Sequence, residues 1–270
     1  MDFKLSNFEL NSMFGICNLS ITPCRKEPVD TSEMVTQLLF GDHFMILETQ
    51  GSWCRIKIAY DGYECWVDKK QFSVIQQHTY DILSSAGIIN CNELVQIITD
   101  KKTGQLFPVT LATSLPNFDD GECVIENQTY SFDGAFIGGQ LPFTKNGIVE
   151  IAMMYLNAPY LWGGKTPFGI DCSGLTQMVY KLNGIKIPRD AHQQAELGET
   201  LSFVEEAEPG DLAFFDNAEG RIVHVGIVMD GNKIIHASGK VRVDGFDHQG
   251  IFNSDSKDYS HRLRLLKKIV

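Results

Sequence analysis

Three side chains in the C-terminal half of the sequence have the chemistry of a hydrolytic site. Cys172 lies in the stretch GIDCSGLTQMVY, and His224 and His236 lie in the later apolar stretches RIVHVGIVM and KIIHAS. A thiolate attacks carbonyl carbon and an imidazole takes up the thiol proton, so a cysteine beside a histidine predicts nucleophilic catalysis. A further polar side chain would hold that imidazole in the useful orientation.

Cys172 is predicted to begin a helix. Apolar residues recur at offsets of 3, 4 and 7 after it, and Gly184 follows the last of them as a C-terminal stop. These apolar positions are Leu175, Met178, Val179 and Leu182. Asp171 is a good N-cap, because its carboxylate can accept a hydrogen bond from a backbone N–H of the first turn. The positive end of the helix dipole would then favour the thiolate form of Cys172.

The residues after Cys172 are compatible with a catalytic site but do not by themselves indicate one. Ser173 and Gly174 add little bulk, so a substrate backbone could approach the sulfur. The stretch fits equally well with a cysteine that is only a small apolar residue at a helix start.

The two histidines are predicted to lie on one face of a hairpin. Alternation along the first strand puts His224 and Gly226 on the same face, where the glycine leaves room beside the imidazole. If residues 230–232 form a three-residue loop and Met229 pairs with Lys233, His236 falls opposite Gly226 and diagonal to His224. A loop one residue shorter would turn His236 to the other face.

Zinc is the competing chemistry for one cysteine and two histidines. No fourth ligand is evident and the spacing matches no short zinc motif, so we predict no metal and no cofactor. The remaining histidines stand in polar or turn-like stretches and are expected to be solvated. These are His43, His78, His192, His248 and His261.

Amino-acid composition limits the classes of partner and the cellular compartment that the sequence predicts. The 270 residues carry 23 basic and 34 acidic side chains, a net charge of −11, which argues against nucleic acid and anionic membrane as partners. Seven scattered cysteines without a C-x-x-C pair fit a reducing compartment. The sequence shows no secretory signal at its start, so we expect a cytoplasmic protein, or a periplasmic or exported one if a leader has been removed. Nothing in the sequence predicts the oligomeric state.

The order of elements predicts an α+β fold preceded by small β-barrels. Residues 10–75 read as short strands with turns at Gly-Asp, Gln-Gly and Asp-Gly, and residues 78–141 repeat the style less clearly. From Thr144 a helix is expected, with Ile148, Ile151, Ala152, Tyr155 and Leu156 on one face and Pro159 closing it. A short helix over 191–197, ended by Gly198, and an antiparallel sheet then follow.

These motifs together resemble the catalytic domain of the NlpC/p60 family of papain-like cysteine peptidases. The matching stretches are PYLWGG, DCSGL, IPRDAHQQAELG, PGDLAFF, HVGIV and IIHAS, with 52 positions from Cys172 to His224 and 12 more to His236. The resemblance implies a papain-like domain over residues 142–270. It also implies that Cys172 is the nucleophile, His224 the base and His236 its orienting partner. The backbone N–H of Cys172 and the hydroxyl of Tyr160 would stabilise the oxyanion.

The stretch over residues 25–42 and the segment DGYECWVD over 61–68 make the N-terminal half similar to the bacterial SH3-like domains of muropeptide-recycling family members. That resemblance implies one such domain over 1–76 and a second barrel over 77–141. It further implies hydrolysis of the γ-D-glutamyl-L-diamino acid bond, to meso-diaminopimelate or lysine, in peptidoglycan-derived peptides with a free N-terminal L-alanine. The alanine ammonium would be bound by Glu33, Tyr63, Asp171 and Ser173.

One position departs from the family pattern. Many relatives place serine or threonine after the Pro-Arg-Asp of IPRDA, whereas this chain has Ala191, which bears on fine substrate preference. Two other functions remain open at this level. One is an amidase or acyltransferase on the same fold, and the other is a module that binds cell wall without catalysis.

Overall fold

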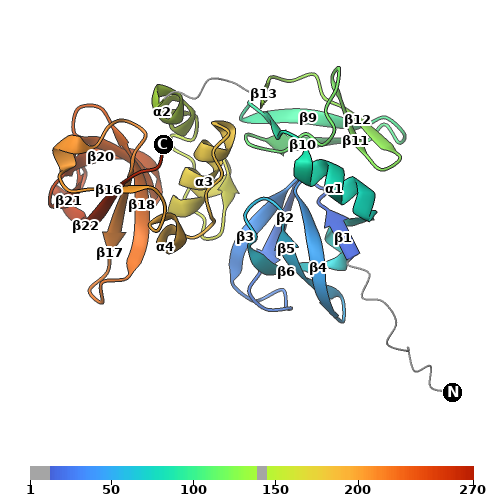
Figure 1. Cartoon of the computed structure of the whole chain (residues 1–270), viewed down its shortest axis with the longest axis horizontal. Coiled ribbons are helices and arrows are strands. Elements are labelled where there is room, and N and C mark those ends of the chain that lie inside the picture. The colour runs from blue at the N-terminus through green and yellow to red at the C-terminus, as the bar shows by residue number, and fades with distance from the viewer. Residues whose placement is uncertain (1–12, 139–144) are drawn as a thin grey trace.

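The computed structural model describes residues 13–138 and 145–270, and the predicted helix start at Thr144 lies outside them. The chain forms an N-terminal sheet, a central segment with two small sheets, and a C-terminal half built from helices and a larger sheet (Figure 1). None of the helices in these ranges is long and apolar enough to cross a membrane.

The N-terminal sheet has seven antiparallel strands in the order β3-β2-β6-β5-β4-β1-β7. Its elements are β1 (Met13–Ile16), β2 (Ile21–Arg25), β3 (Met34–Leu39), β4 (His43–Gln50), β5 (Trp53–Ile58), β6 (Glu64–Asp68), the 3-10 turn η1 (Lys69–Gln71) and β7 (Ser73–Ile75). The three expected turns are confirmed: Gly41, Gly51 and Gly62 all have positive φ, a conformation that glycine adopts without a Cβ clash.

The central segment begins with a helix that the sequence reading missed. Its elements are α1 (Gln77–Ser85), β8 (Ile89–Cys91), β9 (Val95–Asp100), β10 (Leu106–Thr110), β11 (Glu122–Ile125), β12 (Gln128–Ser131) and β13 (Phe136–Gly138). The strands form a four-stranded sheet, β10-β9-β12-β11, and a pair, β13-β8. Helix α1 has no fully buried residue and docks through Tyr80, whose ring stacks on Phe14 at 4.3 Å. Because few residues of α1 are apolar, its sequence shows little of the apolar periodicity that predicts a helix.

The C-terminal half places its helices before its sheet, as predicted. The elements are α2 (Lys145–Met154), β14 (Lys165–Thr166), β15 (Gly169–Ile170), α3 (Cys172–Leu182), α4 (Ala191–Gln194), β16 (Glu199–Leu201), η2 (Val204–Glu206), β17 (Leu212–Asp216), β18 (Ile222–Met229), β19 (Lys233–Ser238), β20 (Lys240–Asp247), β21 (Gly250–Asn253) and β22 (Asp258–Lys268). The sheet order is β16-β22-β17-β18-β19-β20-β21, and β21 also pairs with β22, so the sheet closes on itself.

Two predicted helix ends were wrong. Helix α2 stops at Met154 and Asn157 takes a left-handed conformation with φ of 69°, so the helix ends before Pro159, and Leu156 is 39% exposed rather than on the buried face. Helix α4 is a single turn that stops at Gln194, short of the expected end at 197.

Helix α3 lies between the C-terminal sheet and the N-terminal sheet (Figure 1). A buried carboxylate of the N-terminal half anchors it there. Asp42 has Lys181 Nζ of α3 at 3.4 Å and Lys165 Nζ at 3.7 Å, and it accepts a hydrogen bond from Ser114 of the central segment at 3.2 Å. Burial alone would raise the pKa of Asp42, but the two lysine charges outweigh it and lower that pKa.

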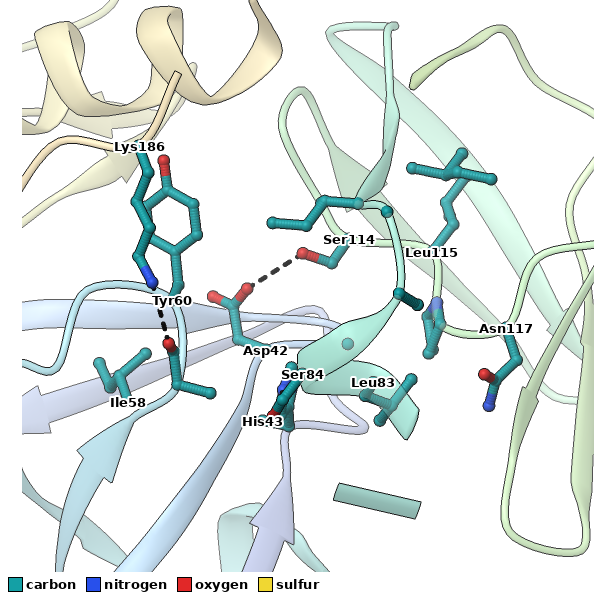
Figure 2. A pocket seen from close by; sticks show the side chains of 17 residues that line it. Asp42, His43, Ile58, Tyr60, Leu83, Ser84, Ser114, Leu115, Asn117 and Lys186 are labelled. Atoms are coloured by element: carbon teal, nitrogen blue, oxygen red, sulfur yellow. Dashed lines mark hydrogen bonds between the residues drawn. The ribbon is translucent and has the colours of Figure 1, made fainter. Parts of the chain in front are cut away.

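Beside this contact residues from the three parts of the chain line an open pocket of about 240 Å³. Figure 2 shows Asp42 and Ser114 directed toward one another at its edge, with Lys186 of the C-terminal half lying along Tyr60. The three segments therefore meet at one buried cluster of charged and polar groups.

We predict that Asp42→Asn lowers the free energy of unfolding by about 3–5 kcal/mol, because it leaves two buried lysines without their counter-charge. Urea denaturation at neutral pH measures the change. The difference in free energy of unfolding between the variant and the wild type should become smaller in acid. Because the pKa of Asp42 is lowered in the folded protein, its carboxylate stabilises the wild type above the ordinary carboxyl range, and this stability is lost as the carboxylate is protonated.

The matched control is Glu64→Gln, which removes one partner of the exposed Arg55 ion pair on the same sheet and should change stability little. Equal stability of Asp42→Asn and wild type at neutral pH would show that the buried cluster does not anchor α3.

Candidate active site

The start of α3 is fixed by a buried ion pair. Arg189 binds both carboxylate oxygens of Asp171, at 3.0 and 2.6 Å. Asp171 also accepts hydrogen bonds from the backbone N–H of Gly174 at 2.6 Å and of Gly163 at 2.8 Å. The predicted N-cap is therefore confirmed, and the same carboxylate joins the helix to the loop before it. Arg189 extends the network to the N-terminal sheet by donating to Thr36 Oγ1 at 3.1 Å.

The glycine after the helix start serves the backbone rather than a substrate. A Cβ on Gly174 would lie 2.3 Å from the carbonyl oxygen of Gly164 and 2.9 Å from Asp171 Oδ1. The space beside Gly174 is thus filled by the preceding loop, which corrects the expectation that it opens the sulfur to a substrate.

Cys172 is the first residue of α3 and its side chain is nearly buried, with 7% of the residue exposed. Burial, and next the negative charge of Asp171, raise the pKa of its thiol to about 12, while the N–H groups of Val225 and Ser173 act in the opposite direction. The backbone N–H of Ser173 at the helix start favours the thiolate, as expected, but it does not determine the protonation state in the protein without substrate. The cost of desolvating the sulfur outweighs the dipole.

The two histidines meet as the hairpin register predicted. Gly226 pairs with His236 and Met229 with Lys233, so His224 and His236 lie diagonally on one face of the sheet. Nε2 of His224 is 2.9 Å from Nδ1 of His236. A Cβ on Gly226 would be 3.1 Å from Cβ of His236, so a side chain at that position would crowd the pair. The bond to His236 leaves Nδ1 as the ring nitrogen of His224 available to a thiol.

His224 is held neutral by its surroundings. It is 5% exposed, and burial, followed by the nearby His261 and His236, keeps its pKa well below its usual range. The ring of His261 stacks on that of His224 with centroids 4.1 Å apart. His261 was expected to be solvated, and that expectation is wrong because β22 carries it beside β17 and β18. Burial lowers the pKa of His261 to about 4.

His43, which was also expected to be solvated, is half-buried. Its ring packs edge-on against Tyr80 of α1, and Nε2 lies 3.0 Å from Ser84 Oγ. The docking of the unforeseen helix α1 accounts for this burial.

A carboxylate that sequence reasoning missed continues the histidine pair. Asp244 of β20 has a fully buried side chain, and its Oδ2 lies 3.1 Å from Nε2 of His236. Arg242 donates to both of its oxygens, at 2.6 and 2.9 Å. Burial alone would raise the pKa of Asp244, but the hydrogen bonds from His236 and Arg242 hold it well below its usual range. The sequence signal that could have indicated Asp244 was the alternation VRVD at 241–244. It lies in β20, a strand that was not predicted from the sequence.

The three histidines His224, His236 and His261 have ring nitrogens within 4.8 Å of one another. Their arrangement favours hydrogen bonding over metal binding. One nitrogen each of His224 and His236 is engaged in their mutual bond, and the stacked rings of His224 and His261 do not direct their lone pairs at a common point.

The other predicted site residues lie along a cleft of about 560 Å³ at the surface of α3. Its lining includes Cys172 together with Tyr160, Asp171, Ser173, Glu33 and Tyr63. Burial raises the pKa of Tyr160 to about 12, so its hydroxyl keeps its proton and can donate a hydrogen bond. His224 directly follows the lining residue Val223 on β18, and His236 lies on the neighbouring strand β19. Glu33 and Tyr63, which directly precede β3 and β6 of the N-terminal sheet, thus form one wall of the cleft, and the start of α3 forms another.

Two cleft residues were not foreseen. Asp190 hydrogen-bonds the hydroxyl of Tyr63, and burial raises the pKa of this carboxyl. Trp162 donates from its indole N–H to Glu33 at 2.8 Å, and Glu33 also pairs with Lys26 at 3.2 Å. Only the fold shows that residues 129 positions apart, Glu33 and Trp162, close the same end of the cleft.

A cysteine at a helix start, backed by two hydrogen-bonded histidines on an adjoining antiparallel sheet, is the architecture of a papain-like cysteine peptidase. Comparison with known proteins agrees. The profile described as "NlpC/P60 family" matches residues 157–257, and that described as "Bacterial dipeptidyl-peptidase Sh3 domain" matches residues 24–72.

Similar proteins share most of the chain. The gamma-D-glutamyl-L-lysine dipeptidyl-peptidase of Bacillus subtilis is 30% identical over 216 residues, covering 75% of this chain and 71% of the relative. Dipeptidyl-peptidase 6 of Lysinibacillus sphaericus is 29% identical over 255 residues, covering 83% and 88%. The crystal structure of an NlpC/P60 family protein from Bacillus cereus has the same fold, with a TM-score of 0.80 at 21% identity over 95% of this chain and 99% of that one.

The chain therefore belongs to the NlpC/P60 family of cysteine peptidases, with an SH3-like domain before the catalytic part.

The raised pKa of the Cys172 thiol predicts how it reacts with iodoacetamide in the absence of substrate. Alkylation should be slow at pH 6 and should accelerate about tenfold per pH unit through the range below pH 9, since only the thiolate reacts. Peptide mapping by mass spectrometry separates Cys172 from the six other cysteines. A rate that is fast and constant from pH 5 upward would show instead a resting thiolate paired with a protonated imidazole.

Proposed function

We propose that this protein is an endopeptidase that hydrolyses the γ-D-glutamyl-L-diamino acid bond of peptidoglycan-derived peptides with a free N-terminal L-alanine. The observation that carries the proposal is the single cleft that holds Cys172 at one side and Glu33, Tyr63 and Asp190 at the other. The name of the Bacillus subtilis relative, gamma-D-glutamyl-L-lysine dipeptidyl-peptidase, supports the same class of bond.

In this proposal the chemistry begins with a neutral pair. As the thiol of Cys172 attacks the scissile carbonyl carbon, its proton passes to Nδ1 of His224, so the S–H bond breaks while N–H and S–C bonds form. The negative oxygen that develops is stabilised by the Tyr160 hydroxyl and by the backbone N–H of Cys172, which lies in the first turn of α3 and has no acceptor within the helix.

His224 then returns the proton to the departing amine of the diamino acid, and the C–N bond breaks. A water molecule, deprotonated by the same imidazole, attacks the thioester carbon; the C–S bond then breaks, the imidazolium returns the proton to sulfur, and the γ-carboxyl group of D-glutamate is released. The net reaction consumes one water and leaves Cys172 as a thiol. No metal or other cofactor is needed for these steps.

The substrate's terminal ammonium is the feature that the far end of the cleft would recognise. Asp171 already accepts from Arg189, Gly163 and Gly174, so its charge is largely satisfied and it acts mainly as a support. Glu33 also has partners, Trp162 and Lys26, but its ion pair with Lys26 is exposed and therefore weak. Glu33 and the Tyr63–Asp190 pair are therefore the acceptors that a substrate ammonium can reach from the cleft. Carboxylates at this end favour a free amine over an acylated one.

Ser173 supports the same region, since its hydroxyl accepts a hydrogen bond from Arg189 at 2.9 Å. The wall formed by the N-terminal sheet would leave room for one residue beyond D-glutamate, and this restricts cleavage to short peptides. Such peptides arise when cell wall is degraded, so we propose a role in recycling released muropeptides, in the cytoplasm. We also propose the division into an SH3-like domain over 1–76, a second barrel over 77–141 and a catalytic domain over 142–270.

The proposal predicts that L-Ala-γ-D-Glu-meso-diaminopimelate, or its lysine analogue, is converted to L-Ala-D-Glu and the free diamino acid. Cys172→Ala should reduce turnover by at least about 10³-fold, because it removes the nucleophile. Acetylating the alanine should lower kcat/KM about 10- to 100-fold, the loss of one charge-assisted hydrogen bond of about 1.5–3 kcal/mol. Product analysis by mass spectrometry measures turnover of the free peptide by the wild type, turnover of the same peptide by Cys172→Ala, and turnover of the acetylated peptide by the wild type.

The control is Cys123→Ala, which changes a buried cysteine of β11 that does not line the cleft and should keep wild-type kcat and KM in the folded protein. Preferred turnover of the acetylated peptide, or of an amide with no γ-D-glutamyl bond, would contradict the proposed substrate and favour an amidase or acyltransferase. Binding to cell wall with no product from any peptide would favour a binding module.

A further inference from the structure

Asp244 stands outside the Cys172, His224 and His236 set, yet it shares their face of the sheet. In the register of β19 with β20, Arg242 lies directly opposite His236, and Asp244 lies opposite Ile234, two residues further along. His224 on β18, His236 on β19 and Asp244 on β20 therefore form one row across three neighbouring strands. Hydrogen bonds of 2.9 and 3.1 Å connect the row.

The environment of Asp244 keeps it an acceptor. The Arg242 guanidinium donates to Oδ2 at 2.6 Å through Nε and to Oδ1 at 2.9 Å through Nη2, which is a bidentate pairing with a carboxylate. Ser254 donates from its hydroxyl to Oδ1 at 3.3 Å. A carboxylate that receives these bonds while fully buried is ionised, in agreement with its lowered pKa.

An acceptor at this end fixes the proton positions along the row. A neutral imidazole has one N–H and one lone pair, so His236 must direct N–H from Nε2 to Asp244 and present the lone pair of Nδ1 to His224. His224 must then donate from Nε2, which leaves the lone pair on its Nδ1. That nitrogen is the one required to receive the proton of Cys172.

We propose that Asp244, held by Arg242, is a positioning residue that sets the reactive tautomer of His224 through His236. The inference rests on the proposed cysteine mechanism and adds a fourth member to it. When the thiol proton moves to Nδ1 of His224, the imidazolium is connected through His236 to a buried negative charge, which stabilises it. Asp244 itself stays ionised throughout and touches neither substrate nor sulfur.

The direct test is the tautomer of each histidine, read by two-bond 1H–15N NMR correlations on the ¹⁵N-histidine-labelled wild-type protein near pH 7. We expect the Nε2–H form for both His224 and His236, assigned with single His→Gln variants. The Nδ1–H form of His224 would overturn the proposal. This measurement uses no substrate, so it stands even if the proposed peptide is not cleaved, and it does not depend on the folding of any Asp244 variant.

The kinetic test compares Asp244→Asn with Asp244→Glu and Asp255→Asn. Asp244→Asn removes the charge, and we expect kcat to fall about 10²- to 10⁴-fold with KM within threefold of wild type. Asp244→Glu restores the carboxylate and should recover at least tenfold of that loss. Asp255→Asn is the matched control, because it removes an exposed partner of the same Arg242 and should change kcat less than threefold.

A merely structural role would give a different result. Asp244→Asn would then lower the melting temperature without changing kcat per folded molecule or the His224 tautomer, and Asp244→Glu would give no selective rescue. Wild-type kcat in folded Asp244→Asn would overturn the proposal. Absence of turnover by the wild type would refute the proposed substrate instead, while the NMR result would still decide the role of Asp244.

Discussion

The bidentate ion pair between Asp171 and Arg189 is the contact on which the arrangement of this molecule depends most. Through it, the first turn of α3, the loop that carries Gly163 and the segment after Pro188 are held against one another and against Thr36 of the N-terminal sheet. A buried ion pair adds little stability on average, but loss of either partner leaves a buried charge, so the contact specifies one geometry strictly. Cys172 directly follows Asp171 in the chain, so the ion pair that fixes Asp171 also fixes the position of Cys172.

The thiol of Cys172 and the imidazole of His224 are both neutral because both are buried. Desolvation raises the pKa of Cys172 and lowers that of His224, and each change disfavours the ion pair in the absence of substrate. We proposed that the carboxylate of Asp244 offsets the cost of burying this charge. It stabilises the imidazolium of His224 through His236 once the thiol proton of Cys172 has moved to His224. In the proposed mechanism the ion pair therefore forms only as the thiol attacks, and the Tyr160 hydroxyl and the Cys172 N–H stabilise the negative charge that develops on the substrate oxygen.

Much of this could be read from the sequence because it is encoded locally. The N-cap at Asp171 and the helix from Cys172 follow from offsets of three and four, and the diagonal of His224 and His236 follows from a three-residue turn. Other features depend on tertiary contacts that no local pattern records. Asp244 became visible only once β20 was paired with β19, His261 only once β22 returned beside β17, and the buried thiol only once the sheet covered α3. Helix α1 was missed because its few apolar residues, among them Tyr80, make sense only against Phe14.

The central claim is that Cys172 is the nucleophile in a cleft completed by the N-terminal sheet. The most direct measurement is the crystal structure of the protein inactivated by the chloromethyl ketone of L-Ala-γ-D-Glu. The account predicts a thioether from Sγ of Cys172 to the inhibitor, the carbonyl oxygen within hydrogen-bond distance of the Tyr160 hydroxyl, and the ammonium between Glu33 and Tyr63. Attachment to any other residue, or an ammonium directed away from the N-terminal sheet, would contradict it.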